Sequence, residues 1–147
     1  MIAHGTLSAG LGAKFTALIA LVAGLILAAW EAGGVSGVAW PGFPNRAVAL
    51  APIGLLGGAL AGLILFFLIG FAVALLGVKR VGWTFTYTTF GAILFALSVN
   101  FLQPLIESAS ETFAGPSGIA AAAVISGLIG AASGYLLAGA LKDAPTI

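Results

Sequence analysis

The sequence contains no cysteine, and that absence excludes disulfide bonds, thiolate metal sites and thiol catalysis. Charge is almost as scarce, because only 6% of the 147 residues are charged, against roughly a quarter in a soluble domain. The net charge of +1 supplies no basic surface for a nucleic acid partner. So few charged side chains cannot cover a surface in water. The sequence therefore predicts an integral membrane protein that contacts the lipid bilayer.

Residues that carry chemistry are also few. The only histidine, His4, stands ahead of the first long apolar segment, whereas a haem-binding bundle places histidines inside its spans. The sequence offers no set of zinc ligands and no serine with a histidine partner for nucleophilic catalysis. We therefore expect no catalytic residue, no cofactor and no metal site, and we expect that the protein is not an enzyme.

Apolar residues, by contrast, make up 61% of the chain, and they gather in four long segments. A helix needs about 20 apolar residues to cross a bilayer core of about 30 Å. None of the segments alternates polar and apolar residues with a period of two, so we expect no strands. The sequence predicts one all-α domain over residues 1–147, an up-down bundle of four transmembrane helices. The expected spans are about 13–30, 51–78, 81–106 and 118–141.

The charged residues lie between or beyond these segments, and they indicate an orientation. One side of a four-crossing path carries Lys14, Lys79, Arg80 and Lys142. The other side carries Glu31, Arg46, Glu107 and Glu111. Basic residues near helix ends favour the cytoplasm, so we expect both termini to be cytoplasmic. The composition, rich in alanine and glycine and without cysteine, favours the inner membrane of a bacterium.

Small residues recur at a spacing of four in the apolar segments. The second segment contains Gly54, Gly58 and Gly62, and the fourth contains Ser126, Gly130 and Gly134. A helix in water tolerates glycine poorly, but in lipid small residues let two helix backbones approach closely. We expect these to be helix-packing positions. They could pack within one bundle or against another protein or another copy of the chain.

A group of polar residues marks the end of the third segment, where Asn100, Gln103 and Glu107 lie on one helix face around Pro104. The proline removes the hydrogen bond that the carbonyl of Asn100 would accept. One interpretation is a small polar pocket for an ion, a lipid headgroup or a substrate. The other is a kinked helix end whose amides bond neighbouring helices.

The stretch "WPGFP" resembles the Pro-Gly-Phe-Phe-Pro loop of the small four-helix subunit of tripartite tricarboxylate transporters. The resemblance covers Pro41–Pro44 and the four-span outline. That family has a longer connection after its second span, whereas this sequence has only Lys79–Arg80 there. The chain is not assigned to the family on this basis.

Two functions remain open from the sequence. The leading hypothesis is a non-catalytic accessory or scaffold subunit, which packs through its small-residue ridges within a larger membrane complex. Its partners would be other membrane subunits or further copies of the chain. The alternative is a small oligomeric transporter or channel with a polar site near Asn100 and Gln103. A bundle of this size would need several copies to enclose a pathway.

Overall fold

The computed structural model describes the backbone of residues 1–31, 43–109 and 115–143, and all side chains of these except residues 31, 43–46 and 105–109. These residues form α1 (Ile2–Glu31), α2 (Phe43–Leu75), the short 3₁₀ helix η3 (Arg80–Gly82), α3 (Trp83–Ala109) and α4 (Gly115–Asp143). The described parts contain no strand, and the expected all-α class with four long helices is confirmed.

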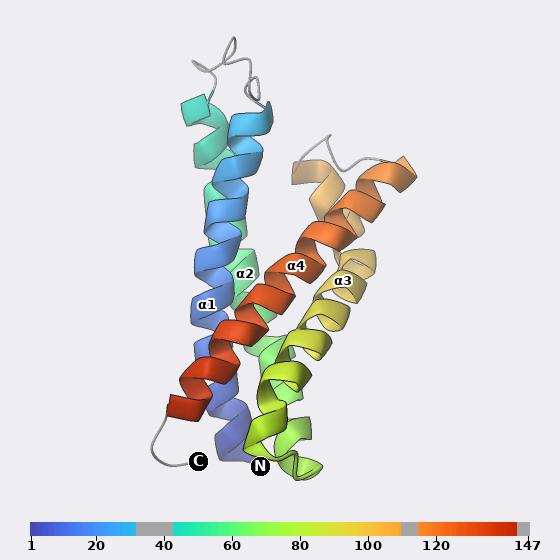
Figure 1. The fold of residues 1–147 in the computed structure, drawn as a ribbon. Helices are drawn as coiled ribbons and strands as arrows, with labels where there is room; N and C mark the ends of the chain where they lie inside the picture. The colour runs from blue at the N-terminus through green and yellow to red at the C-terminus, as the bar shows by residue number, and fades with distance from the viewer. Residues whose placement is uncertain (32–42, 110–114, 144–147) are drawn as a thin grey trace.

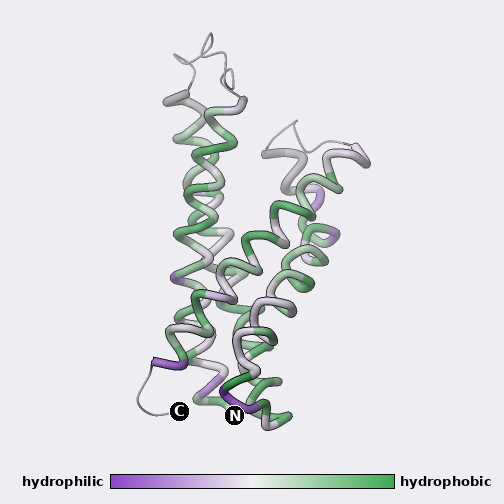
Figure 2. The backbone as a smooth tube through the Cα atoms, in the orientation of Figure 1, coloured by the Kyte–Doolittle hydropathy of each residue, from purple (hydrophilic) through white to green (hydrophobic). Residues whose placement is uncertain are grey.

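Each long helix contains a segment that is long and apolar enough to cross a membrane. The segments are Ile2–Trp30, Ala47–Leu75, Arg80–Pro104 and Gly115–Asp143. Apolar residues run along all four helices, and strongly hydrophilic residues gather mainly near the end that carries the termini (Figure 2). Large apolar side chains are widely exposed, Val81 by 89% and Phe101 by 87%. The protein is therefore a multi-pass membrane protein whose outer surface contacts lipid.

The helix bounds differ from the expected spans, most clearly at the start of α1, although α2 ends at Leu75, before the expected end at 78. This helix begins at Ile2, so Lys14 lies inside the first candidate span and not at its edge. The early turns of α1 are helical because they pack on α2. A Cβ atom on Gly12 would lie 2.6 Å from the Cβ atom of Phe66. α2 begins at Phe43, so Pro52 lies inside that helix and not near its start.

The four helices form two hairpins, because α1 packs along α2 and α3 packs along α4 (Figure 1). The hairpins meet near the two termini, which lie at the same end of the molecule, and diverge toward the opposite end. The hydrophobic core lies where they meet. Its buried members are Phe66, Ile69, Val73, Tyr87, Phe95, Leu137, Ala138 and Leu141.

A short turn joins the two hairpins, and a glycine makes it possible. Gly77 has φ +63°, a left-handed conformation that only glycine adopts without steric cost. This allows the Val78 N–H to donate to the Val73 carbonyl at 3.0 Å, the bond that closes a Schellman motif at the end of α2. The indole N–H of Trp83 then donates to the Val78 carbonyl at 2.9 Å. The turn is thus fixed to the first residue of α3.

Candidate functional site

The glycine ridge of α2 lies against the backbone of α1. A Cβ atom on Gly58 would lie 2.8 Å from the carbonyl oxygen of Thr16, closer than real side chains approach. The ridge therefore allows two helix backbones to touch where any larger residue would separate them. The two other glycines repeat this contact one turn away in each direction, Gly54 on the carbonyl of Ala20 and Gly62 on that of Gly12.

The ridge of α4 lies in the same way against α3. The Ser126 hydroxyl donates to the carbonyl of Phe95 at 2.8 Å. One and two turns further along α4, Gly130 faces the carbonyl of Gly91 and Gly134 faces that of Tyr87. Each predicted helix-packing position therefore lies between the two helices of its own hairpin, either α1 and α2 or α3 and α4.

A buried polar cluster joins the hairpins near the termini. The Tyr87 hydroxyl of α3 is hydrogen-bonded to the Ser8 hydroxyl of α1 at 2.7 Å and to His4 Nε2 at 2.9 Å. Tyr87 and Ser8 are fully buried, and the His4 ring packs on Trp83 with its centroid 5.0 Å away. Because helices gain little from apolar contacts in lipid, these bonds give the two hairpins a specific point of attachment.

Basic residues surround the same end of the molecule. The Arg80 guanidinium donates to the carbonyl of Lys142 and lies over the Trp83 ring, 5.8 Å from its centroid. The Lys142 ammonium donates to the Thr84 hydroxyl at 2.6 Å. Arginine, lysine and tryptophan are the residues that anchor helices at the membrane–water interface. This end therefore lies at the level of the lipid headgroups.

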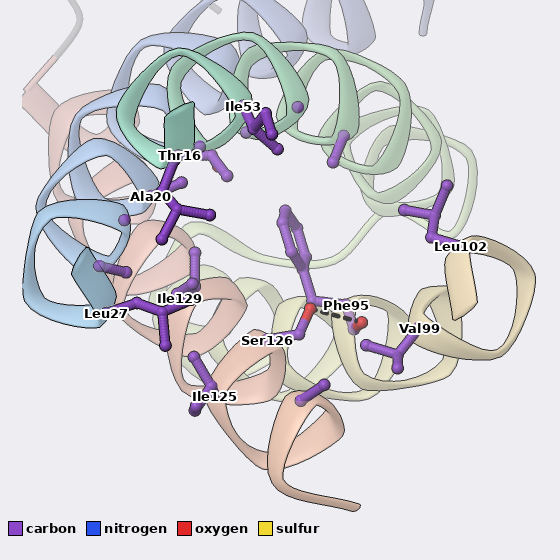
Figure 3. Close-up of a pocket in the computed structure, with 18 of the residues that line it drawn as sticks. Thr16, Ala20, Leu27, Ile53, Phe95, Val99, Leu102, Ile125, Ser126 and Ile129 are labelled. Atoms are coloured by element: carbon purple, nitrogen blue, oxygen red, sulfur yellow. Dashed lines mark hydrogen bonds between the residues drawn. The ribbon is translucent and has the colours of Figure 1, made fainter. Parts of the chain in front are cut away.

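An apolar cleft of about 640 Å³ opens between the diverging ends of the hairpins. All four helices line it, and Phe95 points into it from α3 toward Ile53 of α2 (Figure 3). Much of the wall formed by α1, α2 and α4 consists of glycine and alanine: Ala20, Ala23, Gly24, Gly54, Gly57, Gly58, Ala61, Ala121 and Ala122. Trp30 of α1 and Leu102 of α3 are the lining residues nearest the C-terminal ends of those two helices.

The cleft has few polar atoms, and most of these are already bonded. Ser98 and Ser126 both donate to the carbonyl of Phe95, at 2.7 Å and 2.8 Å. The Thr16 hydroxyl is fully buried and has no hydrogen-bond partner in the described part of the chain. The lining can therefore hold an apolar group, but it offers almost no hydrogen bonds to a polar one.

The predicted polar residues of α3 do not line this cleft, although their neighbours Ser98, Val99 and Leu102 do. Asn100 is exposed on the outer face of α3, and Gln103 is half-buried. Glu107 lies in the last turns of α3, and its side chain is outside the described residues. Among described residues there is no group of three or more histidine, cysteine or acidic side chains that could hold a metal ion.

Sequence reasoning missed two features of the site. His4 and Ser8 stand four residues apart, a spacing that places both on one helix face, and this signal was available. Lys14 was expected at a membrane boundary. It lies instead in the middle part of the first candidate span, and its side chain is exposed on the surface of α1. Comparison with protein-family models, curated proteins and solved structures finds no match to the chain.

Proposed function

We propose that the protein is a non-catalytic subunit of a larger membrane complex and that Lys14 binds a partner helix. The observation that carries this proposal is a lysine on the outer, lipid-facing side of α1, deep within the first candidate span. Ionisable residues inside membrane spans are rare and mark sites of function or of helix pairing. A partner in the membrane gives this lysine a role.

The depth of Lys14 follows from its distance to the interface. His4 packs on Trp83, beside the basic residues that mark the headgroup level. Lys14 follows His4 by ten residues of continuous helix, which is about 15 Å at a rise of 1.5 Å per residue. That distance is half of a hydrocarbon core of about 30 Å. The Cα atom of Lys14 therefore lies near the middle of the bilayer, so its side chain has far to reach to either interface.

The chemistry of the partner follows from charge. A lysine at the centre of a transmembrane helix is unfavourable by about 2.5–3.5 kcal/mol, and a carboxylate offsets this by pairing with it. In the described part of the chain, the acidic residues Glu31, Glu107 and Asp143 lie in the last turns of their helices, and the fourth, Glu111, follows α3 in the sequence. A second copy would therefore place no carboxylate at this depth. The partner is a different protein with an aspartate or glutamate near the middle of a span.

The same arrangement supports the orientation of the complex. Arg80 and Lys142 lie at the end that carries both termini, together with Lys79 of the connecting turn. Basic residues concentrate on the cytoplasmic side of membranes, so the proposal places both termini in the cytoplasm. The membrane we propose is the inner membrane of a bacterium.

A second candidate function, the small oligomeric transporter or channel, is favoured by one observation. The Asn100 amide is exposed on the outer face of α3, beside the exposed ring of Phe101. In a ring of identical copies this amide and Gln103 would face a neighbouring copy, where interhelical hydrogen bonds are worth about 1 kcal/mol or less. A polar path would then run between copies.

The mass of the native assembly in mild detergent tests both functions. We expect wild-type protein to purify with a different, larger chain that has an acidic residue inside a span. Lys14→Met removes the charge and should release that chain, whereas Lys79→Met, at the membrane surface, should retain it. An assembly of identical copies only would contradict the subunit proposal and favour the transporter.

A further inference from the structure

We propose that the cleft between the hairpins binds one acyl chain of a membrane lipid. The site goes beyond the proposed subunit function, because it needs no protein partner. Its walls come from all four helices, and its floor includes Phe95.

The position of the cleft along the membrane fits a lipid chain. Its lining on α1 extends from Thr16 to Trp30, which is about 21 Å of helix. Thr16 lies near the bilayer centre, two residues beyond Lys14, and Trp30 ends the candidate span, at the level where tryptophan meets the headgroups. A leaflet of the hydrocarbon core is about 15 Å thick. The cleft therefore runs from the headgroups to the bilayer centre, as an acyl chain does.

The size and chemistry of the cleft suit an apolar ligand. Water needs two or more polar partners, and the lining offers few of them, because Ser98 and Ser126 already donate their protons to the Phe95 carbonyl. The observed 640 Å³ lies within the range of about 300–1,000 Å³ typical of sites for single small ligands.

Gly57 leaves open space in the wall of the cleft. A Cβ atom on its neighbour Gly58 would collide with α1, so packing within the chain explains that glycine. A Cβ atom on Gly57 would meet nothing within 4 Å, yet Gly57 lines the cleft. Nothing in the described chain needs the space that this glycine leaves. An empty apolar space would deprive its walls of dispersion contacts, and a lipid chain restores them.

The test uses a photoreactive lipid and a variant that fills the cleft. The protein is reconstituted alone into vesicles of phosphatidylethanolamine and phosphatidylglycerol. These vesicles contain a small share of phosphatidylcholine with a diazirine midway along one acyl chain. After illumination, mass spectrometry compares adducts on Phe95, inside the cleft, with adducts on Phe101, which faces the bulk lipid. We expect both residues to be labelled in the wild type.

Gly57→Leu should lower the ratio of Phe95 to Phe101 adducts several-fold, because the leucine side chain occupies the cleft. The matched control is Gly139→Leu, since a Cβ atom on Gly139 also meets nothing within 4 Å but this residue does not line the cleft. Gly57→Ala is a second variant that should fold well, because alanine favours the helix. Its smaller side chain should give a ratio between those of the wild type and Gly57→Leu. An unchanged ratio in both Gly57 variants, or a wild type without Phe95 adducts, would overturn the proposal.

Discussion

The hydroxyl oxygens of Ser8 and Tyr87 lie 2.7 Å apart, and this hydrogen bond ties the first helical hairpin to the second. His4 bonds the same phenol oxygen at 2.9 Å. Three polar side chains thus meet in the one region where the hairpins pack closely, and the hairpins diverge away from that region (Figure 1). Because the hairpins are attached at one end only, they diverge toward the other end, and the apolar cleft opens there.

Tyr87→Phe should destabilise the fold by about 1–3 kcal/mol, since it leaves the buried groups of Ser8 and His4 without their partner. Unfolding in mild detergent, followed by tryptophan fluorescence, measures the change. The control is Tyr135→Phe, because Tyr135 is 61% exposed and its hydroxyl is not part of the cluster. Equal stability of the two variants would show that the cluster contributes nothing to the attachment.

Gly58→Ala and Gly57→Ala should have opposite effects, although the two glycines are adjacent. A methyl group on Gly58 would lie 2.7 Å from the Cβ atom of Ala20, so α1 and α2 must separate, at a cost of about 1–3 kcal/mol. On Gly57 it meets nothing, and the gain in helix propensity is about 0.5–1 kcal/mol. Thermal unfolding of both variants checks this. Similar shifts of the same sign would contradict the packing described for the ridge.

Lys14→Leu should improve insertion of α1 by about 3 kcal/mol when the chain is made without partners, since the unpaired charge near the bilayer centre is removed. The apparent free energy of insertion of the α1 segment measures this. Lys79→Leu, in the turn at the membrane surface, should change insertion much less. If Lys14→Leu leaves insertion unaltered, the lysine reaches an interface and its depth has been misplaced.

The four helices could be predicted because the free energy of moving a side chain into lipid depends on that residue alone. A window of apolar residues therefore shows a span without any knowledge of the neighbours. The ends of the helices could not be predicted equally well. The first turns of α1 are weakly polar, and they are helical within the membrane because Gly12 and Gly5 pack on Phe66 and Phe67 of α2. Such contacts depend on a different part of the sequence.

The spacing of Gly54, Gly58 and Gly62 predicted helix packing, but it left open whether the partner lay inside or outside the chain. The structure places the ridge against α1.

The cleft had no signal in the sequence, because its width depends on the angle between two hairpins. That angle follows from where interhairpin contacts such as Ser8–Tyr87 begin and end. The polar site expected at Asn100, Gln103 and Glu107 stays a prediction.

The divergence of the hairpins also gives the molecule a wedge shape. It displaces more area in the leaflet distal to its termini than in the leaflet that holds them (Figure 1). A wedge is accommodated with least strain where the bilayer bends so that its broader side faces the convex surface. Many such molecules side by side would therefore impose curvature of one sign, and a single molecule would accumulate at membrane regions already bent in that sense.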